Sequence, residues 1–150
     1  MSLASIVFIV LAVTTFFSNG VQAYIHFEAY PLIPFVGKSE FATYIKEYEN
    51  RLTVPLVVPY VLTLLSNLVL IFTRPGNLSI IVVIVAFVLN LAVSVVTLQL
   101  ATPIYNRIKQ AGEAAPAEME QLMRINLIRL VLSSVSSLVV IYMLFTLLPV

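Results

Sequence analysis

Few residues of this 150-residue chain can do chemistry. His26 is its only histidine, and Glu28 follows two positions later, just after the first long apolar stretch. Arg129 lies about one helical turn inside the last apolar stretch. Three interpretations of this arginine stay open. It forms an ion pair with Glu28 or Glu49, it contacts an anionic ligand group, or its side chain snorkels to the membrane surface. For His26, a ligand contact and a simple interfacial hydrogen bond both stay open.

Several familiar sites are excluded by what the chain lacks. It has no cysteine and no aspartate, so it can form no disulfide, no thiolate metal site and no Ser-His-Asp triad. One histidine cannot supply two axial haem ligands, although a single-histidine haem and a quinone are not excluded. The spacing of His26 and Glu28 differs from the Glu-x-x-His motif of di-iron bundles. We expect no metal and no cofactor, and a net charge of +1 offers nothing for nucleic-acid binding.

The composition is that of a membrane protein. Hydrophobic residues make up 61% of the chain and charged residues 10%, whereas soluble domains carry about 25% charged residues. A membrane span needs roughly 20 mostly apolar residues. Four runs meet this condition, at residues 3–24, 52–73, 78–102 and 125–148, and they leave no room for a soluble domain. We therefore expect one four-span domain over residues 1–150, with the first run retained because no lysine or arginine precedes it.

Residues 38–51 have the pattern of an amphipathic helix at a membrane surface. Their apolar members recur at i, i+3, i+4 and i+7, and their charges fall mostly between them. The predicted fold is therefore an all-α membrane protein, an antiparallel four-helix transmembrane bundle with one short interfacial amphipathic helix. The apolar stripe consists of Phe41, Tyr44, Ile45 and Tyr48.

Prolines and glycines predict where helices end or bend. The first helix is predicted to end near Pro31. Pro55 and Pro59 fall near the start of the second span, and Pro59 predicts a bend there. In the third connection, Gly112 predicts a helix stop and Pro116 the next helix start.

Polar residues form a stripe on every predicted span, and each stripe contains an asparagine. Polar groups that face lipid are unfavourable, so the stripes should turn inward and form a polar seam held by interhelical hydrogen bonds. At one end of the bundle the seam gathers a candidate ligand-binding cluster. We expect His26 at its mouth, on the helix face of Asn19 and Gln22. The cluster comprises Asn19, Gln22, His26, Glu28, Arg51, Asn126 and Arg129.

Lysine and arginine are distributed unequally between the two ends of the spans. The first and third connections carry six of them, and the other side has only Arg74. The positive-inside rule then places those two connections in the cytoplasm and both termini outside it. The six are Lys38, Lys46, Arg51, Arg107, Lys109 and Arg124.

Motifs along nearly the whole chain resemble an uncharacterised family of small four-span membrane proteins from bacteria, including cyanobacteria. They are "HFEAYPLIPFVG", "FATYIKEYENRLTVPLVVPY", "TLQLATPIYNRI" and "LMRINLIRL". More distantly, the chain is similar to anthrone-oxygenase-type membrane proteins, which oxygenate polycyclic aromatics without an evident metal. The resemblance implies a bacterial inner membrane or a cyanobacterial thylakoid membrane. The matching positions are Tyr30, Pro31, Leu32, Val36, Gly37, Tyr44, Tyr48, Arg51, Pro55, Pro103, Asn126 and Arg129.

These observations favour a non-catalytic function. We expect an accessory subunit of a larger membrane complex, or a bundle that binds a lipid or quinone-like molecule, with the lipid bilayer as its surroundings. The alternative is a cofactor-independent oxygenase, or a related enzyme, acting on a lipophilic aromatic substrate.

Overall fold

The computed structural model describes residues 2–147, and in this range the chain is helical apart from short connections. The first long rod begins as α1 (Leu3–Tyr24), which the Ser2 side chain caps by accepting a hydrogen bond from the backbone N–H of Ser5. It continues through the π-helical turn η1 (Ile25–Ala29), α2 (Tyr30–Leu32) and the 3₁₀ turn η2 (Ile33–Phe35).

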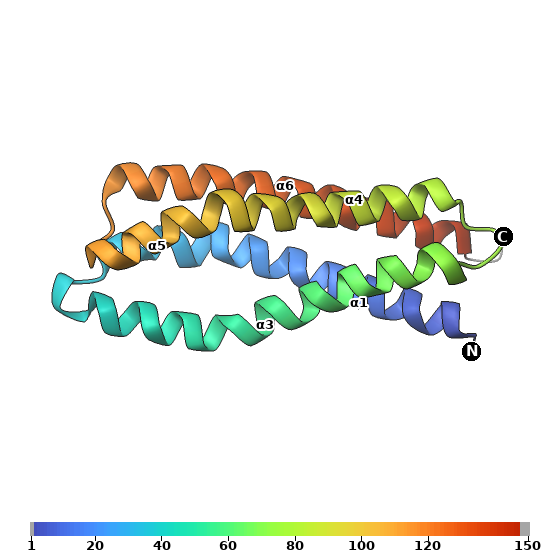
Figure 1. Ribbon diagram of the computed structural model, residues 1–150, viewed down its shortest axis with the longest axis horizontal. Coiled ribbons are helices and arrows are strands. Elements are labelled where there is room, and N and C mark those ends of the chain that lie inside the picture. Colours follow the sequence, from blue (N-terminus) through green and yellow to red (C-terminus); the bar gives the residue numbers. More distant parts are fainter. Residues whose placement is uncertain (1, 148–150) are drawn as a thin grey trace.

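Three further rods complete the fold. The second is α3 (Lys38–Thr73); the third comprises α4 (Ile80–Val96), the π-helical turn η3 (Thr97–Ala101) and α5 (Thr102–Ala111); the fourth is α6 (Pro116–Leu147). Gly112 ends α5 in the left-handed conformation, with φ of 69°, as its sequence position predicts. The rods pack in the order α1, α3, α4, α6 and back to α1, and both termini lie at the same end (Figure 1).

Each rod is long and apolar enough to cross a membrane. They contain 33, 36, 32 and 32 residues, so each is about 50 Å long at ~1.5 Å per residue. The hydrocarbon core of a bilayer is only about 30 Å thick. The prediction of an all-α four-helix membrane bundle is confirmed at this level. The predicted end of the fourth span, residue 148, lies outside the described residues.

The bundle extends furthest beyond the apolar runs at the end opposite the termini, which we call the charged end (residues 25–51 and 103–124). All seven glutamates of the chain belong to it. Three ion pairs join different rods or connections there, and two lie within one helix. The former are Lys38–Glu113, Lys109–Glu49 at 2.6 Å and Arg107–Glu118 at 3.7 Å; the latter are Arg51–Glu47 and Arg124–Glu120.

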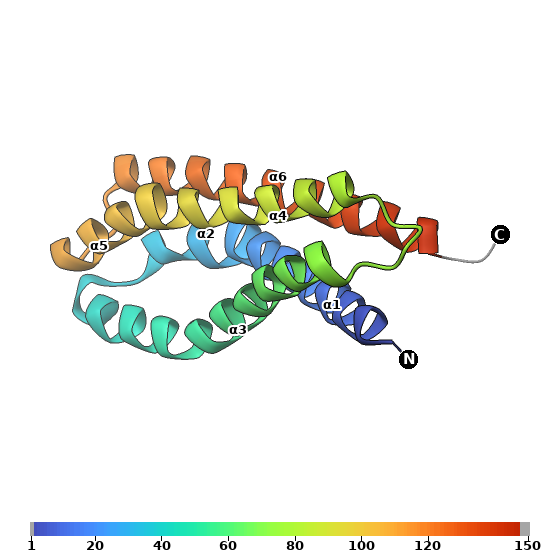
Figure 2. The ribbon, with the colours of Figure 1, turned by 45° about the vertical axis from the view of Figure 1, so that its right-hand side comes forward.

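The predicted separate interfacial helix is wrong. Residues 38–51 form the first part of α3, which continues through Pro55 and Pro59 without a break. The apolar stripe packs onto the other rods and not onto a membrane surface: Phe41 and Ile45 are each 1% exposed, in a cluster with Ile104. The two prolines lie in the middle of α3, where each removes a helix hydrogen bond, and α3 curves strongly (Figure 2).

The α-helical part of the first rod ends at Leu32, near Pro31 as predicted, and a 3₁₀ turn extends the rod to Phe35. Pro31 follows the last residue of η1 by two positions, and Pro103 follows the last residue of η3 by two positions. A proline ring clashes with the carbonyl four residues earlier, here that of Phe27 or Gln99. Both carbonyls lie within the wider π turns, which accommodate the prolines without ending the rods.

The interior has apolar ends and a polar middle. One apolar cluster lies at the charged end and includes Phe41 and Leu122, and the other lies near the termini and includes Leu11 and Met143. Between them, polar side chains are buried, as the stripes predict. Hydrogen bonds cross all four helix interfaces: Thr63 to Thr14 (2.9 Å), Tyr60 with Ser94 (2.7 Å), Asn90 to Ser136 (3.0 Å) and Ser133 to Asn19 (2.8 Å).

The first prediction concerns this polar middle. A double-mutant cycle with Asn90→Ala and Ser136→Ala should give a coupling free energy of about 0.6 kcal/mol, the average for interhelical hydrogen bonds in membranes. Reversible unfolding in mixed detergent micelles measures it. Ser137 provides a matched control, because its hydroxyl donates only to the Ser133 carbonyl of its own helix. Coupling between Asn90 and Ser136 no larger than that between Asn90 and Ser137 would contradict the assignment.

Candidate functional site

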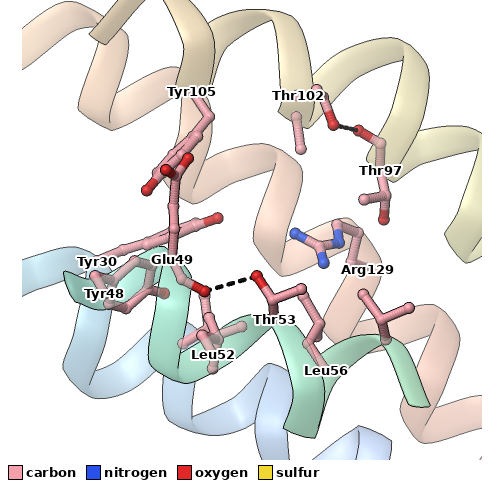
Figure 3. Close-up of a pocket in the computed structure, with 13 residues that line it drawn as sticks. Tyr30, Tyr48, Glu49, Leu52, Thr53, Leu56, Thr97, Thr102, Tyr105 and Arg129 are labelled. Carbon is pink, nitrogen blue, oxygen red and sulfur yellow. Dashed lines mark hydrogen bonds between the residues drawn. The ribbon is translucent and has the colours of Figure 1, made fainter. Parts of the chain in front are cut away.

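A cavity of about 180 Å³ lies where the polar middle meets the charged end. Its walls come from α3, from η3 and α5, from α6, and from the η1–α2 part of the first rod (Figure 3). Leu52, Leu56 and Ile25 give it apolar walls. Thr53 and Thr102 are exposed and also line it, so the cavity reaches the surface between α3 and the η3–α5 segment.

Arg129 supplies a buried positive charge to this cavity. The residue is 3% exposed, and its guanidinium points into the cavity (Figure 3). Its Nη1 donates a long hydrogen bond of 3.3 Å to Oδ1 of Asn126, one turn earlier on α6, and its Nε is buried without a partner. No carboxylate within residues 2–147 lies within 4.0 Å of it. A buried guanidinium in this state is unfavourable and uncommon.

Three tyrosines line the other end of the cavity. Tyr30 comes from α2, Tyr48 from α3 and Tyr105 from α5. In Figure 3 Tyr48 and Tyr105 lie on the side away from Arg129, whereas the Tyr30 side chain extends toward the guanidinium. The hydroxyl oxygens of Tyr48 and Tyr105 are buried and have no hydrogen-bond partner. Buried polar groups without partners are rare in proteins, so two of them on one cavity wall indicate that a partner belongs in the cavity.

Glu49 also lines the cavity, but it does not neutralise Arg129. Its carboxylate accepts a hydrogen bond from the ammonium of Lys109 at 2.6 Å, across the gap from α3 to α5. Figure 3 shows the carboxylate at the tyrosine end. The Thr53 hydroxyl donates to the backbone carbonyl of Glu49 at 2.6 Å. The predicted ion pair between Arg129 and Glu49 is therefore absent from the described chain, and Glu28 is exposed.

The two π turns shape opposite sides of the cavity. Ile25 begins η1, and Tyr30 directly follows it; Thr97 and Ala101 begin and end η3. The Thr102 hydroxyl donates to the carbonyl of Thr97 at 2.9 Å (Figure 3). Single π turns inside α-helices occur frequently at functional sites. Two of them beside one cavity, together with the unpartnered donors, mark this as the candidate site.

Of the predicted cluster only Arg129 lines the cavity, and Gln22 and Asn126 lie behind it. The Asn126 Nδ2 donates to the backbone carbonyl of Gln22 at 3.4 Å, and the Asn126 Oδ1 accepts from Arg129. Asn19 lies deeper in the bundle, where its side-chain oxygen accepts hydrogen bonds from Ser133 and Ser134. Whether these residues bind a ligand stays a prediction.

The other members lie apart from the cavity. Arg51 is exposed and pairs with Glu47 at 3.5 Å, and Glu28 is exposed. His26 is half-buried; its ring packs edge-on against that of Phe27, and its Nδ1 has no partner. No hydrogen bond joins His26 to Asn126 or Arg129 in the part of the chain that is described. The physical reason is η1: its wider turns break the i, i+4 spacing that would place His26 on the face of Gln22.

The sequence pattern did not indicate the tyrosines or the threonines of this site. Tyr48 belongs to the apolar stripe that predicts an interfacial helix, and its ring stacks on Tyr44 with centroids 6.2 Å apart. Thr102 directly precedes Pro103, a residue that carries the family resemblance, and Tyr105 follows it by two positions. Pro103 was therefore the one feature of the sequence that could have indicated these residues, because it accompanies the π turn that helps to form the cavity.

Comparison of the chain with protein-family models, with curated proteins and with solved structures finds no match in any of the three. The family suggested by the sequence motifs thus stays a prediction.

The second prediction separates a functional Arg129 from a structural one. Arg129→Met should leave the free energy of unfolding unchanged or raise it by up to about 3 kcal/mol, because an arginine in the bilayer core costs roughly that much. Unfolding in mixed micelles measures this, and Arg124→Met, at an exposed position, is the matched control. A loss of more than ~2 kcal/mol would show that Arg129 holds the bundle together.

Proposed function

We propose that this bundle binds the polar head group of a lipid- or quinone-like molecule in the cavity at Arg129, and that it does so as a non-catalytic membrane protein. One observation carries the proposal: three buried hydrogen-bond donors without partners line the same cavity. They are the Nε of Arg129 and the hydroxyls of Tyr48 and Tyr105. A ligand with acceptor oxygens would satisfy all three, and leaving a buried donor unsatisfied costs about 1–3 kcal/mol.

The size of the cavity limits the part of the ligand that it can contain. A cavity of roughly 150 Å³ in another protein accommodates benzene. About 180 Å³ therefore suits a single substituted ring or a group of similar size, and not a whole lipid. The remainder of the ligand has to lie outside the cavity.

The surface beside the opening suits an apolar tail. Val57 lines the cavity and is 47% exposed, while Leu98 and Leu100 of η3 are 69% and 47% exposed. Beyond them the bundle is covered by large apolar side chains. In a bilayer, an amphipathic ligand would enter sideways between α3 and η3, with its tail remaining among the lipids.

A binding role also agrees better with this site than catalysis does. Oxygenation of an aromatic substrate without a cofactor requires a base to remove a proton from that substrate. His26 does not line the cavity, and the Glu49 carboxylate is occupied by Lys109. We therefore favour a ligand-binding bundle, which could serve a larger membrane complex as its accessory subunit.

The third prediction tests binding through the tyrosines. Tyr48→Phe and Tyr105→Phe should each weaken binding of a short-chain prenyl naphthoquinone about five- to tenfold, because each removes one hydrogen bond worth ~1 kcal/mol. Equilibrium dialysis of the protein in phosphatidylcholine nanodiscs measures the affinity. Tyr142→Phe is the matched control, since Tyr142 is 57% exposed and lies near the other end of the bundle.

Undiminished affinity in both cavity variants would refute the assignment of the site. Failure of the wild-type protein to bind would refute the ligand class. Formation of an oxygenated product during the incubation would favour the enzymatic alternative.

The fourth prediction concerns orientation, which we propose from the distribution of lysine and arginine: the charged end in the cytoplasm and the termini outside. The chain has no cysteine, so a single one can be introduced. An impermeant maleimide added to intact cells should label Gly76→Cys, between α3 and α4, but not Gln110→Cys at the end of α5. Both should react after permeabilisation. The opposite labelling pattern would show that the charged end lies outside the cytoplasm and would contradict the proposed orientation.

A further inference from the structure

The charge on Arg129 narrows the class of ligand, provided that the proposed binding site is correct. Every glutamate of the chain either forms an ion pair with a cation other than Arg129 or is exposed. Five of the seven pair with other cations, and Glu28 and Glu40 are exposed. The chain has no aspartate. Among residues 2–147, Arg129 is the one buried lysine or arginine, and no carboxylate there lies within 4.0 Å of it.

The free edge of the guanidinium has the geometry of an oxyanion receptor. Nη1 is occupied by Asn126. The Nε atom is buried without a hydrogen-bond partner in the described chain, and with Nη2 it forms the side-on fork of an arginine. This fork matches two oxygens of one planar anionic group, such as a carboxylate or the enolate of an acidic hydroxyquinone. The Tyr30 hydroxyl lies beside the guanidinium and can donate to the same oxyanion.

The other residues that line the cavity indicate that an anion can bind at the Arg129 end only. The Glu49 carboxylate lies at the tyrosine end and is neutralised by Lys109, so it repels an anion beside Arg129 only weakly (Figure 3). The hydroxyls of Tyr48 and Tyr105 can donate to a neutral oxygen at the far end. Leu52 and Leu56 add apolar wall to the same cavity.

We infer that the cavity selects a lipophilic monoanion, a planar oxyanion carried on a ring or chain, over the neutral form of the same molecule. The oxyanion pairs with the Nε–Nη2 edge of Arg129. Two sources share this chemistry: a long-chain carboxylate, and an acidic hydroxyquinone that is ionised at neutral pH.

The test compares matched charged and neutral probes. One pair is oleate and oleyl alcohol, and the other is 2-hydroxy-3-prenyl-1,4-naphthoquinone and its 2-methoxy analogue. Affinities are measured at pH 7 by equilibrium dialysis in phosphatidylcholine nanodiscs, corrected with empty nanodiscs for partition into lipid. In at least one pair, the anion should bind ten or more times as tightly as its neutral partner. The pair that shows the preference identifies the source.

Three variants complete the experiment. Arg129→Met should weaken binding of the preferred anion ten- to a hundredfold and change binding of its neutral partner less than threefold. Arg129→Lys keeps the charge and loses the side-on fork, so it should retain a reduced preference for the anion. If Arg129→Met does not fold, Arg129→Lys replaces it in the test. Arg124→Met removes an exposed cation of the same helix and should change neither affinity.

The outcomes separate this inference from the proposed function. If both neutral probes bind as tightly as their anionic partners or more tightly, the inference that the cavity selects an anion is overturned, while the ligand-binding role stands. An anion preference that survives in Arg129→Met also overturns it. Absence of binding by all four probes and by the prenyl naphthoquinone refutes the ligand-binding role, and the inference fails with it.

Discussion

A polar side chain inside a membrane bundle has to find its hydrogen-bond partner on another helix or on its own backbone. The middle of this bundle is unusually polar, and most of its side chains meet the condition. Thr63 donates a hydrogen bond to Thr14, and Asn90 donates one to Ser136. These hydrogen bonds between helices determine which helices are neighbours. Arg129 is the main exception. It carries a full charge, lies at the edge of the seam, donates a long hydrogen bond to Asn126 of its own helix, and has no carboxylate within 4.0 Å among residues 2–147.

The irregular features of the fold gather around this exception. Both π turns and the curved part of α3 lie beside the cavity, and each is associated with prolines of the rod concerned. The backbone of the first part of α3 lies apart from that of α5 (Figure 2), and the Phe41 side chain and the Glu49–Lys109 ion pair bridge the space between them. Exposed ion pairs of this kind contribute little to stability. The same features that interrupt regular packing therefore create a space lined by unsatisfied donors.

Much of the architecture could be predicted from sequence because length and hydropathy dominate it. Four apolar runs and the inward asparagines indicated a four-helix bundle with a polar seam. The errors arose where regular helical periodicity was assumed. Residues 38–51 look interfacial in isolation, but Phe41 and Ile45 pack on distant residues of α5 and α6. His26 was placed by α-helical spacing, which η1 interrupts. Tyr48 and Tyr105 meet only through tertiary packing, so no local pattern indicates them, whereas Arg129 was recognisable as a cation inside an apolar run.

The proposed function requires that a small lipophilic molecule occupies the cavity at Arg129. Native mass spectrometry of the full chain, purified from its own membrane in mild detergent, tests it most directly. We predict a protein peak with one bound molecule of a few hundred daltons in the wild-type protein, and its loss in a folded Arg129→Met variant. A wild-type protein without such an adduct, or an adduct equally abundant in the variant, would contradict the account.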